Sequence, residues 1–300
     1  MPWLELSIRC SRRDWPRIEE ALEELGALSV TLLDAHDEPI LEPGPGETPL
    51  WRELTANALF DGGADRRGIG LVLQDLVPWL EPARLEFREV ADADWTRAWM
   101  DQYQPMRFGR RLWIYPSTIE PPPDADTVVV RLDPGLAFGT GTHPSTALCL
   151  EWLACNPPAG ATVIDYGCGS GILGIAALLL GVAHVYAVDI DPQALLATRD
   201  NAARNALPCG SLDVGTPQML DTAAPADLLL ANILAGPLIE LAPRLARLLR
   251  PDGTAVLSGI LHEQAAEVLA AWAPWCAHIA TVERDTWCRI ELRRTSSAAP

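Results

Sequence analysis

The sequence is most informative at Thr162-Val-Ile-Asp165-Tyr-Gly167-Cys-Gly169-Ser-Gly171-Ile-Leu, where an apolar run leads into a glycine-rich turn and then into a second apolar run. Glycine allows a sharp turn and a close approach of the backbone to a ligand, because it has no Cβ atom. We therefore predict a buried strand, a ligand-binding turn and a helix. A tight turn that binds nothing is the alternative.

The spacing of the glycines separates two classes of cofactor. A dinucleotide fingerprint has glycines at its first, third and sixth places, whereas Gly167, Gly169 and Gly171 occupy the first, third and fifth, and Ile172 the sixth. This spacing argues against NAD and suits S-adenosylmethionine. Asp165 precedes the first glycine by two residues and can order the loop or meet the ammonium group of that cofactor. We predict that Asp165, Gly167 and Gly169 bind the cofactor.

The next predicted strand ends in Val188-Asp189-Ile190-Asp191-Pro192. Asp189 lies 22 residues beyond Gly167, where a carboxylate can accept hydrogen bonds from both ribose hydroxyls of an adenosine. Asp191 followed by Pro192 is typical of a helix N-cap and a first-turn proline. Asp189 is therefore a cofactor-binding candidate, although NAD enzymes also have an acidic residue here.

A candidate catalytic residue follows the strand predicted over residues 226–233, which ends in Ala231-Asn232-Ile233-Leu234. A buried amide must be hydrogen-bonded to be tolerated. In amino-methylating transferases a similar Asn or Asp, followed by an apolar or prolyl pair, holds the substrate nitrogen so that its lone pair faces the methyl group. We predict this role for Asn232. The alternative is that Asn232 caps a helix beginning near Pro237.

The segment from Leu132 to Thr146, L-D-P-G-L-A-F-G-T-G-T-H-P-S-T, is richer in turn-forming residues than a spacer needs. Its three glycines predict a lid loop that crosses the cofactor and then starts a helix at Pro144. A plain loop is the alternative. His143 could serve acid–base chemistry, but its place before a helix-entry proline favours a role in ordering the loop.

The C-terminal 180 residues alternate strand and helix, which predicts a doubly wound α/β domain with a mostly parallel sheet that binds ligands at the carboxyl ends of its strands. Strands are expected near residues 128–132, 161–166, 184–189, 226–233, 254–259, 279–283 and 288–292, and helices over 171–180, 192–205, 237–249 and 263–272.

The N-terminal 90 residues follow a different pattern, strand-helix-strand twice, which predicts a small α+β ferredoxin-like domain. Trp95, Trp99 and Tyr103 then recur at a spacing of four and predict a linker helix that packs one aromatic face against a neighbouring domain. We expect residues 1–90 to form the ferredoxin-like domain, residues 91–117 the linker and connector, and residues 118–300 the α/β domain.

Composition limits the partners and the compartment. The chain has 23 basic and 40 acidic residues, a formal charge of −17, and every basic residue is arginine. This charge argues against nucleic acid or an anionic membrane as a partner and leaves room for a basic protein. Seven cysteines without a C-x-x-C pair predict neither a metal site nor disulfides. There is no secretory signal and no apolar run of roughly 20 residues, so we expect a cytoplasmic protein.

Taken together, the lid segment, D-Y-G-C-G-S-G-I-L, V-D-I-D-P and A-N-I-L-A-G-P-L closely resemble the bacterial methyltransferases of the eleventh large-subunit ribosomal protein. The resemblance implies a class I, Rossmann-like methyltransferase domain that uses S-adenosylmethionine, preceded by a ferredoxin-like domain that recognises the ribosomal protein. One departure is Thr118, where the family usually has tryptophan. Carried over by position, the cofactor residues are Thr146, Gly167, Asp189 and Asn232, with Phe138 and Thr140 in the covering loop.

The implied reaction methylates lysine ε-amines or the N-terminal α-amine of that ribosomal protein, and we expect the enzyme to be a monomer. Two rivals stay open. One is a methyltransferase for nucleic-acid amines, against which the charge of −17 argues. The other is a ribosome-associated factor without catalytic activity, against which the intact glycine turn, Asp189 and Asn232 argue.

Overall fold

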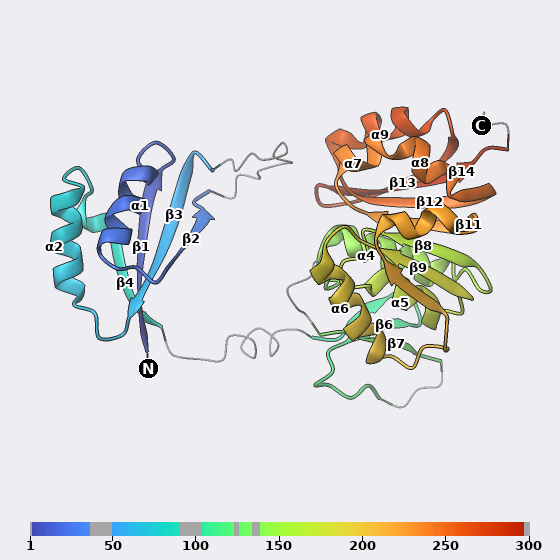
Figure 1. Cartoon of the computed structure of the whole chain (residues 1–300), viewed down its shortest axis with the longest axis horizontal. Helices are drawn as coiled ribbons and strands as arrows, with labels where there is room; N and C mark the ends of the chain where they lie inside the picture. The colour runs from blue at the N-terminus through green and yellow to red at the C-terminus, as the bar shows by residue number, and fades with distance from the viewer. Residues whose placement is uncertain (1, 37–49, 91–103, 123–125, 134–138, 297–300) are drawn as a thin grey trace. The chain divides into compact units, whose positions relative to one another are not determined.

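The first 90 residues have an apolar core of their own, separate from the cores formed by the later residues. The computed structural model describes residues 2–36, 50–90, 104–122, 126–133 and 139–296. Contacts between Cα atoms divide the chain into Met1–Ala98 and Trp99–Pro300 (Figure 1). The linker helix predicted from Trp95, Trp99 and Tyr103 lies outside the described residues. Within the described ranges, no helix is long and apolar enough to span a bilayer.

The N-terminal unit is a four-stranded antiparallel sheet with the strand order β2-β3-β1-β4. Alternate side chains of β1 and β3 are buried, as expected for strands with one covered face. Apolar side chains of both helices complete this core, which confirms the predicted ferredoxin-like arrangement. The elements are β1 (Trp3–Ser11), α1 (Trp15–Glu24), β2 (Ser29–Asp34), β3 (Glu53–Asp61), α2 (Arg66–Leu76) and β4 (Leu85–Val90).

The C-terminal unit is built on a seven-stranded sheet with the order β10-β9-β8-β11-β12-β14-β13. The first five strands are parallel, and β14 is antiparallel to both of its neighbours. The strands are β8 (Thr162–Tyr166), β9 (His184–Val188), β10 (Leu212–Gly215), β11 (Ala226–Asn232), β12 (Leu249–Leu261), β13 (Cys276–Arg284) and β14 (Trp287–Arg294). The helices of this unit are α4 (Pro144–Cys155), α5 (Ile172–Leu179), α6 (Pro192–Ala203), α7 (Ala235–Glu240), α8 (Ala242–Arg247) and α9 (Ala265–Trp272).

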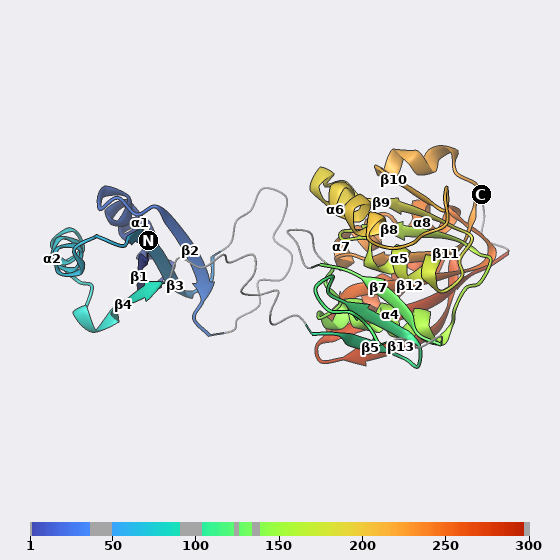
Figure 2. The same ribbon diagram turned by 90° about the horizontal axis from the view of Figure 1, so that it is seen from below.

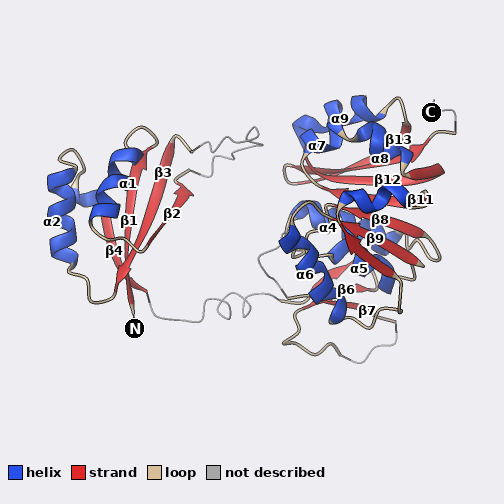
Figure 3. Ribbon diagram, in the orientation of Figure 1, coloured by secondary structure: helices blue, strands red, loops and turns tan. Residues whose placement is uncertain are grey.

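Both faces of this sheet are apolar and both are covered by helices. On β11, Leu228 and Leu230 pack with α4 and α5, whereas Leu229 and Ala231 pack with α7, α8 and α9. Figures 1 and 3 show these two helical layers on opposite sides of the strands. The predicted doubly wound, mostly parallel α/β fold is therefore confirmed.

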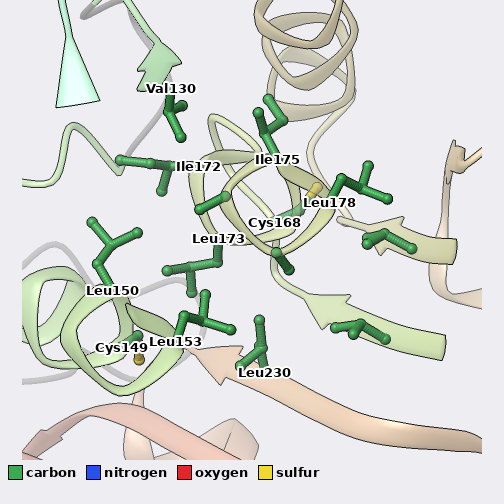
Figure 4. Packing of buried hydrophobic residues seen from close by; sticks show 14 of the residues in the cluster. Val130, Cys149, Leu150, Leu153, Cys168, Ile172, Leu173, Ile175, Leu178 and Leu230 are labelled. Carbon is green, nitrogen blue, oxygen red and sulfur yellow. The ribbon is translucent and has the colours of Figure 1, made fainter. Parts of the chain in front are cut away.

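The strand predicted near residues 128–132 forms as β7 (Val128–Arg131), but it does not join the large sheet. It pairs in parallel with β6 (Leu112–Tyr115), which pairs antiparallel with β5 (Met106–Phe108). This small sheet, seen beside α4 in Figure 2, extends the core of α4 and α5. Val130 lies beside Ile172 in this core (Figure 4). It therefore supports the two helices that frame the glycine-rich turn.

The single helix predicted over residues 237–249 is instead two short helices, α7 and α8. Pro243 stands in the first turn of α8. Proline has no backbone N–H and its ring clashes with the preceding turn, so the first helix must end before it. The second helix, α8, ends at Arg247, before the predicted end at residue 249, because β12 begins at Leu249.

Candidate active site

A cavity of about 350 Å³ lies at the carboxyl ends of β8, β9 and β11, the edge where doubly wound sheets bind ligands. Apolar walls come from Ile172, Leu173, Ile233 and Leu241. The structure brings five of the predicted site residues together at this cavity: Thr146, Gly167, Gly169, Asp189 and Asn232.

The glycine-rich turn joins β8 to α5 and requires glycine at two of its positions for steric reasons. Gly167 and Gly171 have φ angles of 73° and 79°, a region that side chains with a Cβ rarely adopt. A Cβ on Gly167 would come within 2.2 Å of the Ile233 Cγ2 atom, and one on Gly171 within 2.8 Å of Thr198 Cγ2. The turn is therefore packed closely against β11 and α6.

Side chains of α6 hold this turn in shape. The Thr198 hydroxyl donates a 2.9 Å hydrogen bond to the Gly169 carbonyl, and the Asn201 amide donates one of 2.8 Å to the Ser170 carbonyl. The Ser170 hydroxyl in turn donates to the Gly139 carbonyl at 2.5 Å. The turn is thus tied to the segment that leads into α4.

Asp189 follows β9 and faces the same cavity. Its Oδ2 atom accepts a 2.9 Å hydrogen bond from the Gly169 N–H, and its Oδ1 atom accepts one of 3.0 Å from the Asp191 N–H. Asp191 accepts a hydrogen bond from the Gln193 N–H at 2.9 Å and caps α6, which confirms its predicted structural role. Asp189 therefore faces the cavity and holds the glycine-rich turn, whereas Asp191, two residues later, caps α6.

Asp165 lies behind the turn, and it is not among the residues that line the cavity. It is 1% exposed and accepts a 2.8 Å hydrogen bond from the Gly174 N–H in the first turn of α5. Burial raises the pKa of Asp165 to about 7; the Gly174 hydrogen bond opposes this rise and the Asp189 carboxylate adds to it. Of the two tasks predicted for Asp165, the geometry matches the ordering of the loop.

Asn232 ends β11, and its amide is held at one end only. The Nδ2 atom donates a 3.0 Å hydrogen bond to the Thr146 Oγ1 atom on α4. The Oδ1 atom is buried and accepts no hydrogen bond from the described part of the chain. The capping alternative is wrong, because α7 begins after Leu234 without any side-chain cap. A buried amide oxygen without a donor is costly.

The start of α4 is fixed beside Asn232 by three further contacts. The Ser258 hydroxyl, which lies opposite Asn232 in the β11–β12 pairing, is 3.1 Å from the Ser145 carbonyl oxygen. His143 is the N-cap of α4, and its ring accepts a 3.3 Å hydrogen bond from the Ser145 N–H. The His143 ring also packs edge-on against Trp287, with the centroids 4.6 Å apart. These contacts match the predicted ordering role of His143.

The predicted lid loop is described only from Gly139 onward, so Phe138 lies outside the described residues. The Thr140 and Thr142 hydroxyls are 2.8 Å apart and share a hydrogen bond. Thr140 is not among the residues that line the cavity, whereas Gly139 is. The roles predicted for Phe138 and Thr140 in covering the cofactor therefore stay predictions.

Comparison with known proteins identifies the family. Residues 2–295 match the family model described as ribosomal protein L11 methyltransferase. The ribosomal protein L11 methyltransferases of Marinobacter nauticus and Pseudomonas aeruginosa are 51% and 52% identical to this chain, each over 98% of this chain and 99% of the relative. The chain belongs to the ribosomal protein L11 methyltransferase family. The resemblance inferred from the motifs, and with it the assignment as a methyltransferase, is confirmed.

A solved member of this family has the same fold. The ribosomal protein L11 methylase of Lactobacillus delbrueckii subsp. bulgaricus is 34% identical and covers 64% of this chain and 100% of its own, with a TM-score of 0.59. Sequence reasoning missed several cavity residues, among them Cys168, Ile190 and Pro217. Ile190 carried a usable signal, because it directly follows the predicted cofactor residue Asp189 in V-D-I-D-P. In the structure its apolar side chain is 84% exposed.

Proposed function

We propose that this protein transfers methyl groups from S-adenosylmethionine to amines of ribosomal protein L11, at lysine side chains, at the N-terminal amine, or at both. The observation that carries the proposal is the buried Asn232 Oδ1 atom, which has no donor within the described residues and lies at the wall of the cavity. A neutral amine has the N–H group that this oxygen lacks. The names of the two relatives that are more than 50% identical support L11 as the substrate.

The cavity suits S-adenosylmethionine at three points. Asp189 presents carboxylate oxygens where the ribose of an adenosine would lie, and the exposed Ile190 side chain offers an apolar surface to the adenine. The turn at Gly167 brings backbone close to the cavity without side chains in between. When bound, the cofactor supplies a sulfonium methyl group, which is already activated for transfer. Positioning is therefore the main catalytic task of the protein.

Asn232 would orient the nucleophile. If its Oδ1 atom accepts one N–H of the amine, the nitrogen lone pair is free to face the methyl group. With Asp189 and the turn at Gly167 holding S-adenosylmethionine and Asn232 holding the amine, the cofactor would supply its methyl group to that lone pair, an N–C bond forming as the S–C bond breaks.

A general base is not apparent among the described cavity residues, whose ionisable side chains are Tyr166, Cys168 and Asp189. Burial raises the pKa values of Tyr166 and Cys168, so both side chains stay protonated near neutral pH. Both Asp189 oxygens already accept backbone N–H groups. A lysine amine must lose its proton before it can attack. We therefore propose that it does so to water.

The N-terminal unit is proposed to recognise the ribosomal protein. Its helix α1 exposes four glutamates, Glu19, Glu20, Glu23 and Glu24. Such a surface suits a partner that carries lysines, and the overall charge of −17 favours a basic protein over RNA. A ribosomal protein as substrate supports the cytoplasm, which the sequence predicts, as the compartment of the enzyme.

An assay with tritiated S-adenosylmethionine tests the proposal and both rivals. Purified protein is incubated with total ribosomal proteins in one reaction and with ribosomal RNA in another, and labelled products are mapped by mass spectrometry. We expect label in L11, on amines. The chain contains no lysine, so lysine self-methylation adds no background. Label in RNA would favour the nucleic-acid rival, and no label in any fraction would favour the non-catalytic factor.

A further inference from the structure

A buried arginine, Arg289 of β14, has no part in the site as described so far. It is only 7% exposed, and its Nε and Nη1 atoms donate no hydrogen bond within the described part of the chain. Its ion pair with Glu291 is loose, because the Nη1 and Oε2 atoms are 3.6 Å apart, too far for a hydrogen bond. A guanidinium stays positively charged in proteins and is costly to bury without good pairing. The structure therefore holds an incompletely paired positive charge in its interior.

Arg289 lies level with Asn232 in the large sheet, two strands away. Asn232 of β11 pairs with Ser258 of β12. The chain neighbours of Arg289 pair with β12 residues on either side of Ser258. Neighbouring strands are about 4.8 Å apart, so roughly 10 Å separates the backbones of Asn232 and Arg289.

These side chains share the face of the sheet that α4 covers. The Asn232 amide and the Ser258 hydroxyl both contact the first turn of α4. Glu291 accepts a 2.8 Å hydrogen bond from the Trp152 indole of the same helix. Side chains alternate along a strand, so Arg289, two residues from Glu291, points to the same face. The guanidinium is therefore buried beneath α4, on the same side of the sheet as the amide that we propose holds the amine.

We propose that the buried Arg289 charge disfavours the ammonium form of the target lysine and thereby promotes its loss of a proton to water, an inference that rests on the proposed amine-holding role of Asn232. An ammonium group held at Asn232 has the same sign of charge as the guanidinium, whereas a neutral amine is not repelled. At a separation of roughly 10 Å and an effective dielectric constant of about 20, this repulsion lowers the midpoint of lysine deprotonation by about one pH unit. The effect needs no proton acceptor among the cavity residues.

The ionisable groups of α4 and β13 that face Arg289 leave its charge in place. Burial raises the pKa of the Cys149 thiol on α4 to about 12, although the Arg289 charge opposes this rise, so the thiol is neutral. His143 at the start of α4 is also neutral at physiological pH, because burial lowers its pKa. Glu151 of α4 is already paired through both carboxylate oxygens with Arg284 of β13, at 2.8 and 2.9 Å.

Glu291 is the group that opposes Arg289 most directly. It lies level with Leu230, two residues before Asn232 in β11, and its side chain is more exposed than that of Arg289. The carboxylate is therefore farther from the proposed amine position and better screened by water. Asp165, on β8, has a pKa of about 7, so its ionisation is complete at a higher pH.

The test replaces Arg289 by methionine, which removes the charge and keeps an unbranched side chain, and by lysine, which keeps the charge. Single-turnover methylation of L11 lysines is measured at saturating S-adenosylmethionine between about pH 8 and 10.5, because this profile reports ionisation in the enzyme–substrate complex. We expect the Arg289→Met profile to move up by about one pH unit, so that the rate is roughly tenfold lower at pH 8 and meets the wild-type rate at high pH. Arg289→Lys should keep the wild-type profile. An unchanged Arg289→Met profile, or a rate that falls equally at every pH, would overturn the proposal.

Two further variants keep the proposal testable even if Arg289→Met does not fold. Glu291→Gln retains an acceptor for Trp152 and removes the opposing charge, so its profile should move to lower pH, and a profile that stays in place or moves up would overturn the proposal. Arg284→Met is the matched control, because this arginine is one strand farther from Asn232 and 39% exposed. A shift as large in Arg284→Met as in Arg289→Met would also overturn the proposal. These outcomes leave the proposed function standing, whereas a wild-type protein that does not methylate L11 would remove both.

Discussion

The Asp189 carboxylate accepts a 2.9 Å hydrogen bond from the Gly169 N–H and thereby joins the end of β9 to the glycine-rich turn. Its other oxygen accepts from the Asp191 N–H. Each carboxylate oxygen has capacity for a second hydrogen bond, so both can also receive a ribose hydroxyl. One side chain therefore shapes the turn and serves the proposed cofactor.

Replacement of Asp189 by alanine should weaken S-adenosylmethionine binding by about 2 kcal/mol, because charged hydrogen bonds to the ribose are lost. Isothermal titration calorimetry measures this directly. Asp191→Ala is the matched control, since it removes the cap of α6, at about 1 kcal/mol of stability, and leaves the ribose contact. Unchanged affinity in Asp189→Ala would exclude the ribose assignment.

Deletion of residues 1–90 should leave cofactor binding intact and abolish methylation of L11. The two units have separate cores, so the C-terminal unit retains all the described cavity residues and their packing. Calorimetry and the tritium assay on the same truncated protein make the comparison. Methylation at the full rate would show that the N-terminal unit is not needed for recognition.

Asp165 should make stability depend on pH. Its pKa is about 7 in the folded chain and near the ordinary value of 3.8 in the unfolded chain, so between these values the folded state binds the extra proton. The carboxyl therefore lowers the free energy of unfolding as the pH rises from about 4 to about 7. Asp165→Asn keeps an acceptor for Gly174 and cannot ionise. Its stability relative to the wild type should rise across this window, by up to about 4 kcal/mol.

Urea unfolding of both proteins at a series of pH values between 4 and 8 tests this expectation. The Asp165→Asn curve should flatten where the wild-type curve falls. A stability difference between the two proteins that is independent of pH would contradict the assignment of a raised pKa to Asp165.

His143 should be a structural residue. Burial lowers its pKa, so the ring is neutral at physiological pH and can accept the Ser145 N–H. His143→Ala should lower the free energy of unfolding by about 1 kcal/mol, the usual loss of an N-cap. His143→Asn, which supplies another capping side chain, should recover that stability. If both variants instead lost methyl-transfer activity to the same large extent, an acid–base role would be indicated.

Much of the fold could be predicted because local patterns determine it. Apolar and polar residues alternate along much of Trp3–Ser11, which marks a strand with one buried face. The closely spaced glycines that begin at Gly167 predict a tight turn, and their φ angles are positive in the structure. Which sheet a strand joins is a long-range matter: residues 128–131 look like any apolar strand, yet they pair with β6. The short edge strand β10, only Leu212–Gly215, has too few residues to show a period.

The candidate site likewise contains residues that local sequence patterns predict and contacts that these patterns do not reveal. Gly169 was predictable because it lies within the strand-turn-helix motif of β8 and α5, and Asp189 because it directly follows the next strand, β9, 22 residues beyond Gly167. The Thr146–Asn232 hydrogen bond joins residues 86 positions apart, and no local pattern reports it. Asp165 shows a second limit of the sequence. Its position predicts a place beside the glycine-rich turn, but packing determines that its carboxylate accepts the Gly174 N–H behind the cavity wall.

The most direct test of the proposed chemistry is the single-turnover rate of L11 methylation by Asn232→Ala, with thermal unfolding measured on the same sample. Loss of one oriented polar contact in a closed site typically lowers the rate roughly a hundredfold, or by about 3 kcal/mol. Stability should change by less than about 1 kcal/mol, because the substitution removes a buried oxygen that has no donor in the described structure. A stable protein with a hundredfold slower methyl transfer is the predicted result, and a destabilised protein with near-normal transfer would contradict the account.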